Sequence, residues 1–141
     1  MSFYLDASVI VPTLAAQSMS HEALAFLNRS PGPFSVSDLC EAEVAAAASR
    51  MVRMSILTAD RGVAMLHRFD TWLAAEGDPV ATETSDFRAA IVLVRRFELK
   101  LRTPDALHLA ISARLGAQLV TFDRRLALAA QAVGLTVHTP S

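Results

Sequence analysis

The chain of 141 residues has the length of one domain, with 52% hydrophobic residues and a net charge of −1 from 13 basic and 14 acidic side chains. Its single cysteine, Cys40, excludes intrachain disulfides and thiolate metal clusters, and a reducing cytoplasm is the expected location. No apolar run reaches the roughly 18 to 20 residues of a membrane span, and the first apolar run lacks the basic start of a signal peptide.

Short apolar runs alternate with longer helical patterns along the chain, which predicts an α/β fold with a parallel sheet. The predicted strands cover residues 3–5, 34–36, 80–82, 119–122 and 136–138. Helices are predicted at about 20–29, 37–53, 58–76, from 85 onward, 103–116 and 124–133, with start and stop signals such as Pro104 and Gly134. Since no repeat or linker interrupts this order, residues 1–141 are predicted to form a single domain.

The helices predicted at 37–53 and 58–76 are separated by a short turn. This spacing favours an αα-hairpin that packs on the sheet or projects from it. Phe69 and Trp72 are predicted to lie in the packing seam of this hairpin. The alternative is that they belong to a protein-binding surface.

Three acidic residues stand at the ends of predicted strands or at the start of a helix. Asp6 and Asp123 each end an apolar run, and Asp105 lies in the first turn of a predicted helix. In a right-handed parallel arrangement, strand carboxyl ends and the amino ends of helices share one sheet edge. Each acid alone could be a turn, cap or first-turn charge. Together they predict a divalent metal site, because clustered carboxylates repel one another unless a cation joins them.

Glu43 is predicted to be a fourth acid of this site, on the ground of helical phase. At about 100° per residue, Glu43 falls within the apolar arc that contains Val44, whereas Glu41 falls outside it. A carboxylate on an apolar face needs a partner, or it has a large desolvation cost. An arginine partner is the alternative to a metal. Glu41 and Asp38 are interpreted as solvated charges.

These residues, in this order, resemble the PIN-domain ribonuclease family, and within it the VapC toxins of bacterial toxin–antitoxin systems. The resemblance spans essentially the whole chain and depends on Tyr4-Leu5-Asp6-Ala7-Ser8, Ser37 with Glu43, Thr103-Pro104-Asp105-Ala106-Leu107-His108-Leu109-Ala110, and Leu119-Val120-Thr121-Phe122-Asp123. It implies a PIN-like three-layer fold, with a five-stranded parallel sheet flanked by helices and the αα-hairpin. It also implies Mg²⁺ or Mn²⁺ dependence, RNA phosphodiester cleavage, a homodimer or higher assembly, and a VapB-like antitoxin in the active-site groove.

The resemblance also assigns roles to single residues. The family's acidic quartet is matched at Asp6, Glu43, Asp105 and Asp123. Asp6 and Asp105 are expected to bind the metal directly, with Asp123 and Glu43 completing or supporting the coordination, partly through water. Ser8 and Thr121 are expected to hydrogen-bond to these carboxylates, although a helix-cap role for Ser8 is an equal alternative.

The sequence has no evident nucleophile motif, so the expected reaction is metal-assisted hydrolysis, with Glu43 or Asp123 orienting or deprotonating the attacking water. His108 lies one helical turn beyond the third acid and could reach the site, but a packed or hydrogen-bonded structural role is expected. Arg124 and Arg125 are candidates for positioning substrate, or else solvated helix charges.

Two other enzyme classes fit poorly. An aspartyl phosphatase would have its nucleophile at Asp6 and normally a second aspartate where this chain has Ser8. Lys100 is the only lysine, and no lysine is expected near the site, which also argues against a phospho-receiver domain. A catalytically silent PIN-fold binding module and a housekeeping PIN nuclease stay open as alternatives.

Overall fold

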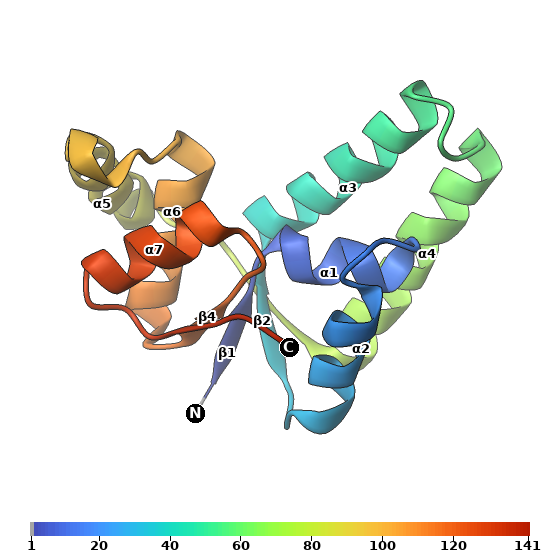
Figure 1. Ribbon diagram of the computed structural model, residues 1–141, viewed down its shortest axis with the longest axis horizontal. Helices are drawn as coiled ribbons and strands as arrows, with labels where there is room; N and C mark the ends of the chain where they lie inside the picture. Colours follow the sequence, from blue (N-terminus) through green and yellow to red (C-terminus); the bar gives the residue numbers. More distant parts are fainter. Residues whose placement is uncertain (1) are drawn as a thin grey trace.

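A parallel five-stranded sheet forms the centre of the computed structural model, which describes residues 2–141 (Figure 1). The strand order is β3-β2-β1-β4-β5, and every neighbouring pair is parallel. The strands are β1 (Phe3–Leu5), β2 (Phe34–Ser37), β3 (Gly77–Val80), β4 (Gln118–Val120) and β5 (Val137–His138). The helices are α1 (Ala7–Leu14), α2 (Ser20–Arg29), α3 (Asp38–Arg53), α4 (Ala59–Glu76), α5 (Thr84–Val94), the short η1 (Phe97–Leu99), α6 (Thr103–Leu115) and α7 (Arg124–Ala132).

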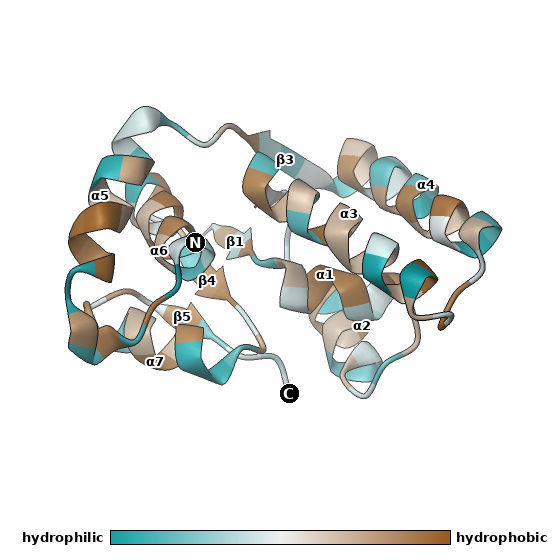
Figure 2. Cartoon of the chain, turned by 90° about the horizontal axis from the view of Figure 1, so that it is seen from above, coloured by the Kyte–Doolittle hydropathy of each residue, from teal (hydrophilic) through white to brown (hydrophobic). Residues whose placement is uncertain are grey.

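Helices cover both faces of the sheet, and strand alternation divides the core between them. Leu5 belongs to an apolar cluster with residues of α1 to α4, including Phe69. Its neighbour Tyr4 packs on the other side, with Leu109 of α6 and Leu126 of α7. From above, the strands lie between the group of α1 to α4 and the group of α5 to α7 (Figure 2). The predicted three-layer α/β fold is confirmed.

Helix α6 is a core helix. The seven consecutive residues from Ala106 to Ser112 are all buried, as expected for a helix that is apolar on every side. Pro104 lies in the first turn, where a missing N–H group costs little, and Gly116 ends the helix at φ 60°. The N-cap residue is Arg102, one position before the predicted start.

The predicted αα-hairpin is formed by α3 and α4, which project together beyond the sheet (Figure 1). Phe69 is buried, and Trp72 stacks on it with ring centroids 6.4 Å apart. Trp72 also stacks on Phe34 of β2, at 6.2 Å. These rings therefore pack α4 against the sheet, and their predicted place in the seam between α3 and α4 stays a prediction.

The prediction and the structure differ most at helix α1 and strand β3. Helix α1 was not predicted, because Val9, Ile10, Val11 and Pro12 have low helix propensity; all four are buried, and tertiary packing overrides that preference. Strand β3 begins three residues before the predicted one and includes Pro79. A proline is tolerated there because β3 is an edge strand that pairs only with β2.

Within residues 2–141, no helix has the length and apolar character needed to cross a membrane.

Candidate functional site

Asp6 lies directly after β1, at the carboxyl edge of the sheet, and is only 4% exposed. Its Oδ1 accepts a hydrogen bond from Ser8 Oγ at 2.6 Å, and its Oδ2 accepts one from Thr121 Oγ1 at 2.7 Å. Burial raises the pKa of the Asp6 carboxyl, although the two hydroxyl donors act in the opposite direction. No ion pair with Asp6 occurs in the part of the chain that the structure describes.

The two hydroxyl groups on Asp6 are oriented by backbone amides. Phe122 N–H donates to Ser8 Oγ at 2.9 Å, and Asp123 N–H donates to Thr121 Oγ1 at 2.9 Å. Because each hydroxyl oxygen already accepts a proton, its own proton is free to point at Asp6. Ser8 lies inside α1 and does not cap it. Of the two roles expected for Ser8, the structure therefore has the hydrogen bond to a carboxylate and not the helix cap.

Glu43 lies in the second turn of α3 and forms a hydrogen-bonded pair with Nε2 of His108 from α6. Besides burial, the negative charge of Glu43 also raises the pKa of Asp6. Glu41 and Glu43 are both half-buried, so burial alone does not separate them, whereas the pairing with His108 does.

Asp105 and Asp123 are half-buried carboxylates at helix starts on the same edge. Asp105 Oδ2 accepts from the Arg102 backbone N–H at 3.1 Å and from its Nε at 3.3 Å. Asp123 is the N-cap of α7, and its Oδ1 accepts the amides of Arg125 at 3.0 Å and Leu126 at 3.2 Å. Each carboxylate makes these local bonds through a single oxygen.

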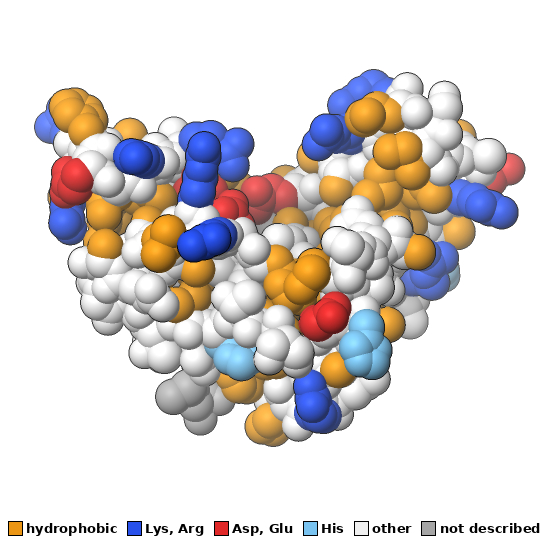
Figure 3. Space-filling view, viewed as in Figure 1, with side chains coloured by type: hydrophobic (Ala, Val, Ile, Leu, Met, Phe, Trp, Pro, Cys, Tyr) orange, Lys and Arg blue, Asp and Glu red, His pale blue; other side chains and the backbone are white. Residues whose placement is uncertain are grey.

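The sheet edge between the two helical groups is a notch with acidic side chains on its floor and Lys and Arg side chains on both sides (Figure 3). Parallel topology thus brings the four predicted acids to one edge, as expected. However, no three His, Cys, Asp or Glu side chains within residues 2–141 form a group that could hold a metal ion. The expected single cluster of acids is therefore not assembled in this structure.

The donor set at this edge still fits a hard divalent cation. Mg²⁺ is usually held by one or two protein carboxylates, with water and substrate phosphate supplying the other ligands. Asp6 is buried with neutral hydroxyl partners, so a cation would compensate its charge. Asp105 and Asp123 begin helices at the same edge, although within residues 2–141 they form no metal-holding group with Asp6.

Several contacts at the site were not predicted. The sequence placed His108 in a packed or hydrogen-bonded role, which is confirmed, but its bonds to Glu43 and Tyr4 were not foreseen. Nor was the bond between Tyr4 and Ser37. The available signals in the sequence were weak: Tyr4 lies on β1 two residues before Asp6, and His108 occurs on a largely apolar helix.

A model of the PIN domain family matches residues 3–132. Among solved structures, VapC20 of Mycobacterium tuberculosis, a toxin that cleaves the sarcin–ricin loop, has a TM-score of 0.74 and 17% identity, over 96% of this chain and 97% of that one. A toxin–antitoxin complex from Klebsiella pneumoniae has a TM-score of 0.72 and 19% identity, over 99% and 98%. FitAcB from Neisseria gonorrhoeae has a TM-score of 0.73 and 16% identity, over 96% and 95%. Such low identities show a shared fold, and a comparison with curated proteins finds no match.

Proposed function

The chain belongs to the PIN domain family, and we propose that it is a metal-dependent endoribonuclease, the toxin of a VapBC-type toxin–antitoxin pair. The observation that supports this proposal most strongly is the state of Asp6. Its carboxylate is buried at the carboxyl edge, has a raised pKa because of that burial, and has only neutral hydrogen-bond donors. This is the environment of a group that needs an external cation.

In this proposal Asp6, Asp105 and Asp123 hold Mg²⁺ or Mn²⁺. A bound ion would activate water and neutralise charge that develops on the phosphate in the transition state. Ser8 and Thr121 hold the Asp6 carboxylate in place. Glu43 accepts a proton from the attacking water as general base.

RNA is the proposed substrate, and its phosphates would contact the arginines beside the acids. Arg102 lies next to Asp105 with a largely exposed side chain, and Arg124 and Arg125 begin α7 at the same edge. Figure 3 shows that basic groups flank the acidic floor on both sides. Arginine matches phosphate well, because its planar guanidinium donates two hydrogen bonds at once.

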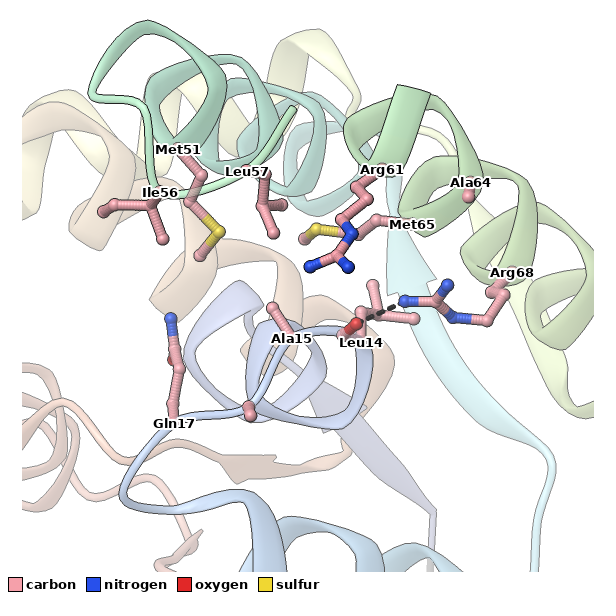
Figure 4. A pocket seen from close by; sticks show the side chains of 11 residues that line it. Leu14, Ala15, Gln17, Met51, Ile56, Leu57, Arg61, Ala64, Met65 and Arg68 are labelled. Carbon is pink, nitrogen blue, oxygen red and sulfur yellow. Dashed lines mark hydrogen bonds between the residues drawn. The ribbon is translucent and has the colours of Figure 1, made fainter. Parts of the chain in front are cut away.

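The proposed partner is a VapB-like antitoxin that lays an amphipathic helix along the hairpin. A groove of about 680 Å³ lies between the end of α1 and the far part of α3 and α4 (Figure 4). Met51, Ile56 and Leu57 supply apolar walls, while Arg61 and Arg68 supply cationic groups. The apolar face of a helix with neighbouring acidic residues complements this surface. From there, a basic side chain of the partner could reach the carboxylates.

Self-association is also proposed, as a homodimer that could enter a larger toxin–antitoxin assembly. Apolar side chains on α5 and η1 are exposed in the single chain and are candidates for the surface that a second copy would cover: Phe87, Ile91, Val92 and Phe97. Light scattering on the purified chain, compared with a Phe87→Asp and Ile91→Asp double variant, tests this assignment. A wild-type monomer would contradict it.

The activity is tested by incubating the purified chain with total RNA in the presence of Mg²⁺, Mn²⁺ or EDTA. Cleavage is expected with either ion, loss of cleavage with EDTA, and recovery when the ion is added back. The matched control is Asp6→Asn. A folded chain that binds Mn²⁺ but cleaves no RNA would contradict the proposal and favour a silent PIN-fold binding module.

The toxin role is tested in cells. Expression of the chain alone should stop growth, and expression of Asp6→Asn should not. If a small antitoxin-like gene lies beside the gene for this chain, its co-expression should restore growth and give a co-purifying complex. Harmless expression of a chain that cleaves RNA in vitro would favour a housekeeping PIN nuclease.

A further inference from the structure

A line of hydrogen bonds runs through the core and ends on Glu43. Cys40 N–H donates to Ser37 Oγ at 3.1 Å, Ser37 Oγ lies 2.7 Å from the Tyr4 hydroxyl, and that hydroxyl lies 2.7 Å from Nδ1 of His108. Nε2 of His108 bonds to Glu43. Tyr4, Ser37 and His108 are buried, whereas the side chain of Glu43 is 35% exposed. The line therefore joins buried groups to one carboxylate at the notch.

Every donor and acceptor along this line has a partner if each group donates its proton to the next one, from the Cys40 amide toward Glu43. An ionised Glu43 only accepts, so Nε2 of His108 carries the proton. In a neutral ring, Nδ1 then accepts from the Tyr4 hydroxyl. The Tyr4 oxygen accepts from the Ser37 hydroxyl, whose oxygen accepts from the Cys40 amide. Burial raises the pKa of Tyr4 well above its usual range, so its proton stays available for this bond.

The opposite direction leaves a buried proton without an acceptor. A doubly protonated His108 would donate from Nδ1 to the Tyr4 oxygen, and Tyr4 would then donate to Ser37 Oγ. That oxygen already accepts from Cys40 N–H, and within residues 2–141 the Ser37 side chain bonds only to these two groups. The Ser37 proton would be buried and unpaired, which is costly. The network therefore assigns the neutral Nε2–H tautomer.

We infer that His108 is a positioning residue: as a neutral Nε2–H donor fixed by Tyr4 and Ser37, it holds the Glu43 carboxylate in the orientation that receives the proton of the attacking water. The inference rests on the proposed nuclease function and adds a residue to it. Glu43 extends from a helix surface through several rotatable bonds, and a donor on a core helix limits its conformations. Small misplacements of a base reduce the rate even where the fold is unchanged.

The kinetic test compares two substitutions of the same residue. His108→Gln keeps an N–H group near the position of Nε2, whereas His108→Leu removes the donor. His108→Leu should lower kcat for RNA cleavage by about tenfold, with KM within about twofold, and His108→Gln should restore most of that loss. Melting temperatures of both variants monitor the fold. If both variants cleave as the wild type does, or if both lose activity only in proportion to lost folded protein, the inference is overturned.

A double mutant shows whether His108 acts through Glu43. In a Glu43→Gln background, His108→Leu should cause no further loss of kcat, because the base is already gone. A loss that multiplies with that of Glu43→Gln would show that His108 acts elsewhere, and would overturn the inference.

A nuclear magnetic resonance measurement tests the pairing without any activity. In ¹⁵N-labelled chain at neutral pH, His108 should be neutral, with its proton on Nε2, and His108→Leu identifies the signal. A proton on Nδ1 overturns the assignment. If the wild-type chain cleaves no RNA, the proposed function fails and the positioning role of His108 fails with it. If the wild type cleaves RNA and His108→Leu cleaves it equally well, the inference is overturned and the proposed function is not.

Discussion

Asp6 and Asp86 are two buried aspartates with opposite electrostatic surroundings. Asp86, in the first turn of α5, is 2% exposed and receives bonds of 2.9 Å from both Nε and Nη2 of Arg114. Although burial raises the pKa of Asp86, the Arg114 bonds and the amide of Glu83 lower it below its ordinary value. Asp6 is buried to a similar degree, has only hydroxyl donors, and has a raised pKa.

We interpret this difference as the one between a structural carboxylate, Asp86, and the proposed metal ligand, Asp6. Arg114 of α6 compensates the negative charge of Asp86 of α5, so this carboxylate needs no cation from outside the chain. Among residues 2–141, no cationic side chain forms an ion pair with Asp6. A buried carboxylate without a cation is unfavourable for folding, and such a cost is characteristic of a binding or catalytic site.

The largest expected effect is on cleavage. Asp6→Asn should lower the rate of RNA hydrolysis by about 10³-fold or more, since the bound ion is worth several kcal/mol in the transition state. Its melting temperature should equal or exceed that of the wild type, because a buried charge is removed. Asp86→Asn, assayed below its melting temperature, is the control and should cleave normally. Equal losses of activity in Asp6→Asn and Asp86→Asn would contradict the distinction between a metal-binding Asp6 and a structural Asp86.

The next effect concerns the two neighbouring glutamates of α3. Glu43→Gln should lower kcat by about 10²-fold, the usual contribution of a general base, and Glu41→Gln should stay within about twofold of the wild type. Single-turnover cleavage of one RNA substrate by both variants measures this. The same loss in both, or the reverse order, would show that helical phase and the His108 contact select the wrong residue.

Stability should respond to Asp86 and depend on pH. Asp86→Asn should lower the free energy of unfolding by about 2 kcal/mol at pH 7, because a charge-assisted pair with Arg114 is lost. The pKa of Asp86 is lowered in the folded state, so this stabilisation is complete above the ordinary carboxyl pKa and is lost as the pH falls toward the folded value. Urea unfolding at pH 7 and near pH 3 should show the difference between wild type and variant shrinking in acid. A constant difference would contradict the ion-pair account.

The smallest expected effect is that of the arginine on Asp105. Arg102→Gln should raise the affinity for Mn²⁺ by no more than about threefold, because an exposed ion pair is worth less than about 1 kcal/mol. The backbone amide of residue 102 still bonds to Asp105 in this variant. A large loss of affinity would instead show that Arg102 helps to build the site.

How much was predictable depends on whether a contact follows from local order along the chain. Asp6 and Asp123 could be placed at one edge because both follow parallel strands. Helical phase predicted that Glu43 and not Glu41 faces the core, whereas the two side chains are both half-buried. The partner of Glu43 could not be predicted, because His108 lies 65 residues away in sequence and the contact depends on how α3 and α6 pack. The same is true of Asp86 and Arg114, 28 residues apart.

Local propensity also failed where packing decides the outcome. Residues 7–14 are rich in β-branched side chains and contain Pro12, yet they form α1 because this segment packs into the core beside β1 and β2. Strand β3 includes Pro79 because an edge strand needs hydrogen bonds on one side only.

Calorimetric titration of the chain with Mn²⁺ tests the central claim most directly, that Asp6 is a buried carboxylate that binds an external cation. The wild type and Asp86→Asn should bind with the same affinity, and Asp6→Asn should bind at least about tenfold more weakly, since a ligand charge is removed from the site. An unchanged Mn²⁺ affinity in Asp6→Asn would contradict the account.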